Sequence, residues 1–217
     1  MRGKVGVLCP TRGRPLEFRA FAQSVLSTSG ADVLAYIDDD QQALYADVLG
    51  PDASKRIRWM VAPRIGLAAS ANALVRQFDD YDLYGLVPDD ATMETPGWDD
   101  WSIEASDQFP NRVCVISPCH NQGHHVDMPF VTRAWIKAVG WFACPDVYHH
   151  AWPIVIGVIG EMSAIVHAPV HKFNVYHPAK VEMLSENLLA KDMQAFYTFV
   201  ALKLPAVVDR VRKAMAA

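Results

Sequence analysis

Two adjacent carboxylates, Asp89 and Asp90, follow an apolar run and are the residues of this chain best suited to chemistry. The run spans 81–87 and predicts a buried strand, which would deliver both acids to an edge of a sheet. In open α/β sheets, ligands bind beyond the carboxyl ends of the strands. Two hard oxygen donors side by side suit Mg²⁺ or Mn²⁺, especially where substrate phosphates supply further ligands. The alternative interpretation is a solvated acidic turn.

Two arginines follow the first expected strand. Strand 4–9 stops at the loop Pro10-Thr-Arg-Gly-Arg-Pro15, and the apolar spacing of 16–26 then predicts a helix. Arg12 and Arg14 would therefore lie at a strand's carboxyl end, beside a helix N-terminus. That position suits guanidinium groups that bind a phosphate or a nucleotide base. A charged surface turn explains the same residues without a ligand.

A second acidic cluster, Asp38-Asp39-Asp40, ends the second expected strand, 31–37. These acids precede residues 41–49, which can form a helix. The cluster therefore either caps that helix or reads the ribose or base of a nucleotide.

Gly66 and Asn72 accompany the third expected strand. Strand 57–62 precedes Gly66, and the small residues within 67–78 predict a helix that lies close to the sheet. Asn72 on this helix faces either a ligand or solvent. The alternation of strands and helices up to this point predicts a parallel α/β sheet.

The second half of the chain has a more mixed pattern. The remaining expected elements are a helix over 98–106, strands over 113–116 and 128–131, a helix capped by Thr132 that runs to 139, a helix over 147–159 and a strand over 163–166. The segment Cys119-His-Asn-Gln-Gly-His-His125 predicts an active-site lid or wall, or else a zinc site. Its spacing matches no standard zinc motif.

Composition favours one folded domain. The chain has 217 residues, 51% of them hydrophobic and 20% charged, which is enough to bury a substantial core. The formal net charge of −4 argues against binding nucleic acid by bulk electrostatics. The cysteines form no Cys-x-x-Cys pair, no signal-peptide core follows Met1, and the apolar segment 151–166 is interrupted by Pro153 and Glu161. We therefore expect reduced thiols, a cytoplasmic protein and no membrane anchor.

The C-terminal residues predict helices. Apolar residues between 185 and 204 follow a helical spacing, Pro205 interrupts it, and a basic helix follows. We expect residues 1–180 to form the main domain and residues 181–217 a helical extension packed on it. The extension would serve packing or homodimer formation, with contact to a membrane surface as the alternative.

The order and spacing of these motifs resemble the inverting family 2 glycosyltransferases of GT-A fold, and small bacterial and bacteriophage members are most similar. The resemblance extends over about residues 4–178. It rests on the loop Pro10-Thr-Arg-Gly-Arg-Pro15, Asp38, Gly66 with Asn72, Asp89-Asp90, Thr95-Pro-Gly-Trp98, Asp146 and His177. The family's Asp-x-Asp motif reads Pro88-Asp89-Asp90 in this chain, so its first acid is missing.

The resemblance implies a fold and a set of site residues. The fold is α/β, a GT-A fold with a mostly parallel central sheet flanked by helices and a C-terminal helical tail. Asp89 would contact the sugar-nucleotide, and Asp90 would bind the metal, Mn²⁺ or Mg²⁺. His177, just past an apolar alternating run, either completes the coordination or is a surface histidine. The residues expected to line the nucleotide-sugar site are Pro10, Thr11, Arg12, Arg14, Asp38, Gly66, Asn72 and Asp89.

The implied chemistry is transfer of a sugar from a nucleotide-diphosphate sugar, with a UDP-sugar as the expected donor, to an acceptor hydroxyl. A divalent cation held by Asp90 would act as a Lewis acid for the leaving diphosphate. Asp146 follows the apolar pair Trp141-Phe142 and resembles the acceptor-side carboxylate of the family. It is therefore the expected general base, with Glu161 as the second candidate. Trp98 and Trp141 are either core residues or platforms for a sugar or base.

The acceptor is not encoded in a local motif. Likeness to phage-encoded members suggests hydroxymethylated pyrimidines in DNA, and the protein would then act in the host cytoplasm. A sugar-nucleotide-forming nucleotidyltransferase is one alternative, but it would show a Gly-rich pyrophosphate loop with a following lysine where this chain has Thr11-Arg-Gly-Arg14. A non-catalytic nucleotide-sugar-binding or assembly module is the other. The missing acid of the Asp-x-Asp motif favours it, whereas Asp90, Asp146 and His177 argue against it.

Overall fold

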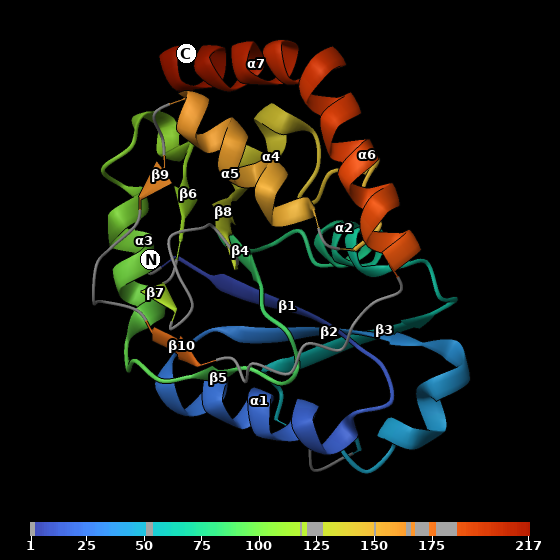
Figure 1. Ribbon diagram of the computed structural model, residues 1–217. Coiled ribbons are helices and arrows are strands. Elements are labelled where there is room, and N and C mark those ends of the chain that lie inside the picture. The colour runs from blue at the N-terminus through green and yellow to red at the C-terminus, as the bar shows by residue number, and fades with distance from the viewer. Residues whose placement is uncertain are drawn as a thin grey trace.

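The structure is a computed structural model that describes residues 3–50, 54–117, 119–120, 128–149, 151–163, 166–167, 174–176 and 186–217 (Figure 1). The elements of the first half are β1 (Val5–Thr11), α1 (Pro15–Thr28), β2 (Asp32–Asp38), η1 (Asp39–Tyr45), β3 (Ile57–Ala62), α2 (Leu67–Gln77), β4 (Leu83–Leu86), β5 (Thr92–Met93) and α3 (Trp98–Ser106). Those of the second half are η2 (Pro110–Arg112), β6 (Val115–Ile116), β7 (Cys119–His120), β8 (Phe130–Thr132), α4 (Arg133–Val139), α5 (Trp152–Ser163), β9 (Val166–His167), β10 (Asn174–Tyr176), α6 (Glu186–Leu202) and α7 (Leu204–Ala216).

Seven strands form the main sheet, in the order β3-β2-β1-β4-β8-β6-β9. β1 pairs in parallel with β2 and β4, and β2 pairs in parallel with β3. β8 runs antiparallel to both of its neighbours, β4 and β6, whereas β9 is again parallel to β6. The prediction of a mostly parallel sheet flanked by helices is therefore confirmed. Because β1, β2 and β4 are adjacent and parallel, the residues that follow them meet at one edge of the sheet.

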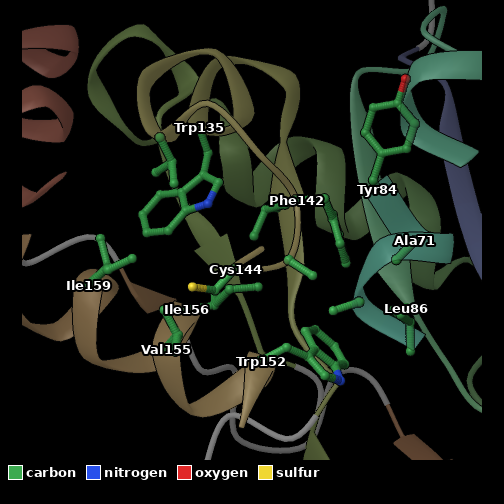
Figure 2. Packing of buried hydrophobic residues seen from close by; sticks show 14 of the residues in the cluster. Ala71, Tyr84, Leu86, Trp135, Phe142, Cys144, Trp152, Val155, Ile156 and Ile159 are labelled. Carbon is green, nitrogen blue, oxygen red and sulfur yellow. The ribbon is translucent and has the colours of Figure 1, made fainter. Parts of the chain in front are cut away.

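Helices cover both faces of this sheet, and each face has its own buried cluster (Figure 1). On one face, Phe18 of α1 and Trp98 of α3 pack against the strands. On the other face lie α2, α4, α5 and α7. Figure 2 shows this second cluster, in which Trp135 of α4, Trp152 of α5 and Phe142 from the loop between them are buried together. Burial of such large apolar side chains stabilises that loop.

A second, three-stranded sheet joins distant parts of the chain, in the order β5-β10-β7. β5 begins at Thr92, shortly after Asp90 in the sequence. It pairs antiparallel with β10, so that Thr92 lies opposite Tyr176. His177 itself lies outside the described residues, and its predicted metal contact stays a prediction. The pairing does bring the chain just ahead of His177 alongside the strand that follows Asp90.

The acidic segment after β2 differs from expectation. Residues 41–49 do not form the expected helix, because a 3₁₀-helix begins at Asp39 and ends at Tyr45. Asp38 precedes this helix and makes no side-chain cap, whereas Asp39 Oδ1 accepts the N–H of Asp40 at 2.8 Å. Asp40 instead binds Arg12, which keeps its carboxylate at the edge of the sheet.

The apolar segment after residue 150 also differs from expectation. The helix expected over 147–159 begins at Trp152 and extends through Ser163, so the strand expected over 163–166 is wrong at its start. Pro153 lies in the first helical turn, where a missing N–H is tolerated. A continuous apolar run is compatible with helix or strand, and periodicity alone does not place the boundary between them.

The two C-terminal helices complete the fold. Pro205 lies in the first turn of α7, and α6 ends before it at Leu202, which is the expected break. α7 contributes four apolar residues to the cluster that contains α2, α4 and α5: Leu204, Val207, Val208 and Val211. α6 leaves Leu189, Tyr197 and Leu202 exposed. A homodimer through these helices and a division of the chain at residue 180 stay predictions. No helix within the described ranges is long and apolar enough to cross a membrane.

Candidate active site

One guanidinium bridges the two central carboxylates. Arg14, just ahead of α1, places Nη2 2.8 Å from Asp89 Oδ1 and Nη1 2.9 Å from Asp90 Oδ2. The Asp89 side chain is 1% exposed, and Asp90 is more accessible. Both acids follow β4, at the edge that Arg14 reaches from the end of β1. The acidic pair and the arginine loop therefore form one charged cluster.

A buried hydroxyl network supports this cluster. Thr11, the last residue of β1, donates to Asp89 Oδ2 at 2.6 Å, and its oxygen lies 2.6 Å from the Tyr45 hydroxyl. Tyr45 in turn accepts the backbone N–H of Arg14 at 3.2 Å. Burial raises the pKa of Asp89, while the hydrogen bond from Thr11 and the charge of Arg14 act in the opposite direction. The network thus fixes the orientation of Asp89 and the backbone that carries Arg14.

Arg12 binds the second acidic cluster. Its two terminal nitrogens each lie 2.6 Å from one carboxylate oxygen of Asp40, and Nη1 is also 2.8 Å from Asp38 Oδ2. Asp38 is buried at the end of β2, whereas Asp40 is exposed. The hydrogen bonds from Arg12 hold the pKa of Asp40 below its ordinary value. The Arg12–Asp40 contact is bidentate, but both side chains are exposed, so solvent screens the pair.

Asn72 holds a loop. Its side-chain amide donates to the Ala143 carbonyl at 2.7 Å, and its side-chain oxygen accepts the N–H groups of Phe142 at 2.9 Å and of Ala143 at 3.1 Å. The residue is buried, so the alternative of a solvent-facing Asn72 is wrong. The sequence did not indicate this backbone contact. A contact between Asn72 and a nucleotide-sugar stays a prediction.

Gly66 makes room for Tyr148 at the carboxyl end of β3. Its φ is +88°, and a Cβ at this position would overlap the ring of Tyr148. The carbonyl of Tyr148 accepts the N–H of Ala68 at 3.2 Å. Asp192 of α6 accepts the N–H of Tyr148 at 2.9 Å and that of His149 at 2.8 Å. The segment around Tyr148 is therefore fastened both to the N-terminus of α2 and to α6.

Asp146 lines a cavity beside this segment. The cavity has a volume of about 480 Å³, and six of the residues that line it are Ile65, Asn72, Arg76, Trp141, Asp146 and Tyr148. Asp146 Oδ2 lies 2.6 Å from Lys203 Nζ, at the junction of α6 and α7. Both side chains are partly exposed. The cavity joins an apolar wall, aromatic rings and one carboxylate, which is an arrangement suited to a polar organic ligand.

The other residues that the sequence suggested for the site lie apart from the acids that follow β4. The partners of Asp146 are Lys203 and Cys144, so they do not connect it with the acids that follow β4. Glu161 is exposed in the last turn of α5, at the opposite end of that helix from the cavity segment. Trp98 is fully buried, which confirms its interpretation as a core residue. In the part of the chain that the structure describes, no group of three or more His, Cys, Asp or Glu side chains is arranged to hold a metal ion.

Comparison with known proteins establishes the fold. No protein-family model matches this sequence, and no curated protein matches it either. GalNAc-T7 with UDP, GalNAc and Mn²⁺ superposes with a TM-score of 0.72 at 8% identity, over 90% of this chain and 48% of that chain. The fold is that of the GT-A glycosyltransferases.

Two further solved structures agree. S. aureus TarS in complex with UDP-GlcNAc has a TM-score of 0.60 at 13% identity, over 96% of this chain and 70% of that one. The mannosyltransferase PcManGT from Pyrobaculum calidifontis, in complex with GDP-Man and Mn²⁺, has a TM-score of 0.57 at 13% identity, over 100% of this chain and 75% of that one. At such identities the likeness shows the fold alone. Membership of family 2 and likeness to phage proteins stay predictions.

Four side chains of this region are not predicted by the sequence: Tyr45, Tyr148, Asp192 and Lys203. Tyr45 carries a local signal, since it is an aromatic residue that ends a polar acidic segment. Lys203 carries none, because 57 positions separate it from Asp146.

Proposed function

We propose that this protein is a metal-assisted glycosyltransferase that moves a sugar from a nucleotide-diphosphate sugar to an acceptor hydroxyl. The observation that carries the proposal is the convergence of Asp89 and Asp90 after β4 on the arginine loop after β1, within a GT-A fold. Proteins of similar fold have been solved with UDP and Mn²⁺ and with GDP-Man and Mn²⁺, which supports a donor of the same class.

The carboxylate pair fits a divalent cation. Asp89 Oδ1 and Asp90 Oδ2 lie 2.8 and 2.9 Å from one guanidinium, so both oxygens already face a single positive group. Mn²⁺ and Mg²⁺ take oxygen ligands and at nucleotide sites commonly use one or two carboxylates plus phosphates. We assign the direct metal contact to Asp90, with His177 as the further ligand. When bound, the cation would act as a Lewis acid for the leaving diphosphate.

The nucleoside is assigned to the ends of β1 and β2. Asp38 is a buried acceptor at the end of β2, in position to receive hydrogen bonds from ribose hydroxyls or a base N–H. Arg12 is exposed beside it and can exchange its pair with Asp40 for the nucleotide. Pro10 and Gly66 would contribute backbone to the wall of the same pocket.

The acceptor is assigned to the cavity that Asp146 lines. As the acceptor oxygen attacks the anomeric carbon, its proton moves to the Asp146 carboxylate, and the bond from that carbon to the diphosphate oxygen breaks. A single displacement of this kind inverts the anomeric configuration. Lys203 binds Oδ2 of Asp146, so Oδ1 would be the oxygen that accepts the proton. Trp141 and Tyr148 would contact the apolar face of the acceptor.

A donor and acceptor panel tests the proposal. The protein is incubated with UDP-sugars or GDP-sugars, with Mn²⁺ or with EDTA, and with acceptors that include glycans and DNA carrying hydroxymethylated pyrimidines. Release of the nucleoside diphosphate, together with an inverted product identified by NMR, is the expected result. Asp90→Asn should remove the dependence of donor binding on Mn²⁺.

Two outcomes would reject the proposal and identify the alternatives. Synthesis of a nucleotide-sugar from a nucleoside triphosphate and a sugar phosphate would identify a nucleotidyltransferase. Tight nucleotide-sugar binding with no turnover on any acceptor or on water would identify a binding or assembly module.

A further inference from the structure

Arg14 occupies the position that a cation would take between Asp89 Oδ1 and Asp90 Oδ2. Its two terminal nitrogens lie 2.8 Å from Asp89 Oδ1 and 2.9 Å from Asp90 Oδ2. The other oxygen of Asp89 accepts the hydroxyl of Thr11 at 2.6 Å. Oδ1 is therefore the Asp89 oxygen directed toward the cation position. A metal ion that binds Asp90 Oδ2 on the side facing Asp89 must first displace the guanidinium.

Charge and burial favour that exchange. Two carboxylates face one monovalent guanidinium, whereas a divalent cation would balance both of them. Asp89 is 1% exposed and cannot turn to water, but Arg14 is 39% exposed and can. Arg14 is therefore the member of the cluster that moves.

The loop allows the side chain to move while the backbone stays. The N–H of Arg14 is held by Tyr45 at 3.2 Å. Gly13 has φ of +71°, and apart from its two chain neighbours no atom of the described residues lies within 4 Å of the place where its Cβ would be, so the loop has open space on that side. A displaced guanidinium would remain beside the carboxyl ends of β1 and β4. There it would meet the diphosphate of the proposed donor, whose oxygens match the planar fork of arginine.

We propose that Arg14 is an exchangeable counter-ion. It holds Asp89 and Asp90 together in the absence of metal, and a divalent cation displaces it and makes it available to the donor diphosphate. Metal and nucleoside diphosphate then bind with positive coupling through this residue, in addition to any direct contact between them, and the coupling acts equally in both directions. The inference rests on the proposed function, because it requires a metal and a diphosphate at this edge.

Arg12 provides the matched comparison. It lies in the same loop, carries the same charge and has nearly the same exposure, 38% against 39%. Its partners are Asp38 and Asp40, and neither of them is the carboxylate assigned to the metal. Removing either arginine makes the edge more negative, but only removal of Arg14 clears the cation position.

The experiment is a Mn²⁺ titration of the full chain, in which EPR measures free Mn²⁺, without nucleotide and then with UDP or GDP. Arg14→Ala and Arg14→Gln should bind Mn²⁺ at least about 5-fold more tightly than the wild type without nucleotide. Without nucleotide, Arg12→Gln should bind Mn²⁺ with an affinity close to that of the wild type. The nucleotide should then increase Mn²⁺ affinity less in the Arg14 variants than in the wild type. Circular dichroism confirms folding, and Arg14→Gln removes the charge but keeps a polar side chain that can donate hydrogen bonds.

Two results would overturn the inference alone. One is Mn²⁺ binding by both Arg14 variants that is equal to or weaker than that of the wild type. The other is an equal gain in Arg12→Gln, which would reduce the effect to general electrostatics. In both cases a wild type that binds Mn²⁺ with nucleotide leaves the proposed function standing. Absence of Mn²⁺ binding in every variant, with or without nucleotide, would reject both.

Discussion

The donor edge and the acceptor cavity are held together in different ways. At the edge, charged side chains hold one another, as Arg14 does with Asp89 and Asp90. Around the cavity, buried side chains hold backbone groups. Asn72 binds the loop after α4, and Asp192 binds the N–H groups of the segment around Tyr148.

The contacts at the donor edge are of a kind that a ligand can replace, whereas the contacts around the cavity are of a kind that a ligand does not replace. A metal ion or a phosphate offers the same kind of interaction as an ion-pair partner, so it can replace that partner. A buried N–H or C=O has no such substitute, and it is left unsatisfied when its side-chain partner is lost. Substitutions at the edge should therefore change ligand affinity, whereas substitutions around the cavity frame should change stability.

Asp146→Asn should give the largest effect on activity. Asp146 lies in the cavity, but unlike the residues of its frame it is assigned to the chemical step. We expect the chemical step to slow by roughly 10²–10⁴-fold with donor affinity nearly unchanged. Single-turnover kinetics and donor titration measure the two separately. Asp209→Asn, which removes an exposed α7 carboxylate paired with Lys213, is the control. Near-normal transfer by Asp146→Asn would move the search for the base to Glu161.

Asn72→Ala should reduce the free energy of unfolding by about 2–4 kcal/mol, because it orphans three buried backbone groups of Phe142 and Ala143. Urea denaturation measures the loss. Arg76→Ala, an exposed change on the same helix, should stay within about 0.5 kcal/mol of the wild type. A loss as small as that control would mean that packing of Phe142 alone holds the loop.

Gly66→Ala tests the point where edge and cavity meet. It combines a positive φ with overlap of the Tyr148 ring, and we expect a stability loss of about 1–3 kcal/mol together with weaker nucleotide binding. Gly97 has a similar φ of +72°, and apart from its chain neighbours no described atom lies within 4 Å of the added Cβ, so Gly97→Ala measures the cost of the backbone conformation alone. Equal losses of stability in the two variants would show that the Tyr148 ring moves aside without a cost in free energy.

Lys203→Met should have the smallest effect. Its ion pair with Asp146 is partly exposed, so we expect a change in unfolding free energy of less than about 1 kcal/mol that disappears in high salt. Thermal melts at low and high salt measure it. A large loss of unfolding free energy that salt does not change would show that this pair stabilises the fold, as the buried contacts around the cavity do.

Local sequence patterns predict the strand ends well, and with them most of the donor edge. Asp38, Asp89 and the arginine loop each follow a recognisable apolar run, and parallel pairing of β1, β2 and β4 then brings them together. Thr132 is predicted as an N-cap and is confirmed, since its side chain accepts the N–H of Trp135 at 3.1 Å. These features depend on neighbours within one element or at its ends.

The contacts that frame the cavity depend on neighbours far apart in the chain. Asn72 and Ala143 are separated by 71 positions, and Lys203 and Asp146 by 57. Periodicity reports which face of an element is apolar, but not which loop lies against a given polar side chain. The same limit explains why a buried Asn72 resembles a ligand-binding residue in the sequence.

The position of α7 in the core has a consequence for synthesis. Val211 of α7 shares one buried cluster with Leu8 of β1, so this face of the sheet closes only when nearly the whole described chain is present. On the ribosome, α7 emerges after every other described element, and until then the apolar surfaces of α4 and α5 that it covers face water. Partly folded chains that expose apolar surface are prone to aggregate. Nascent chains of this protein should therefore need chaperone protection until α7 has been released.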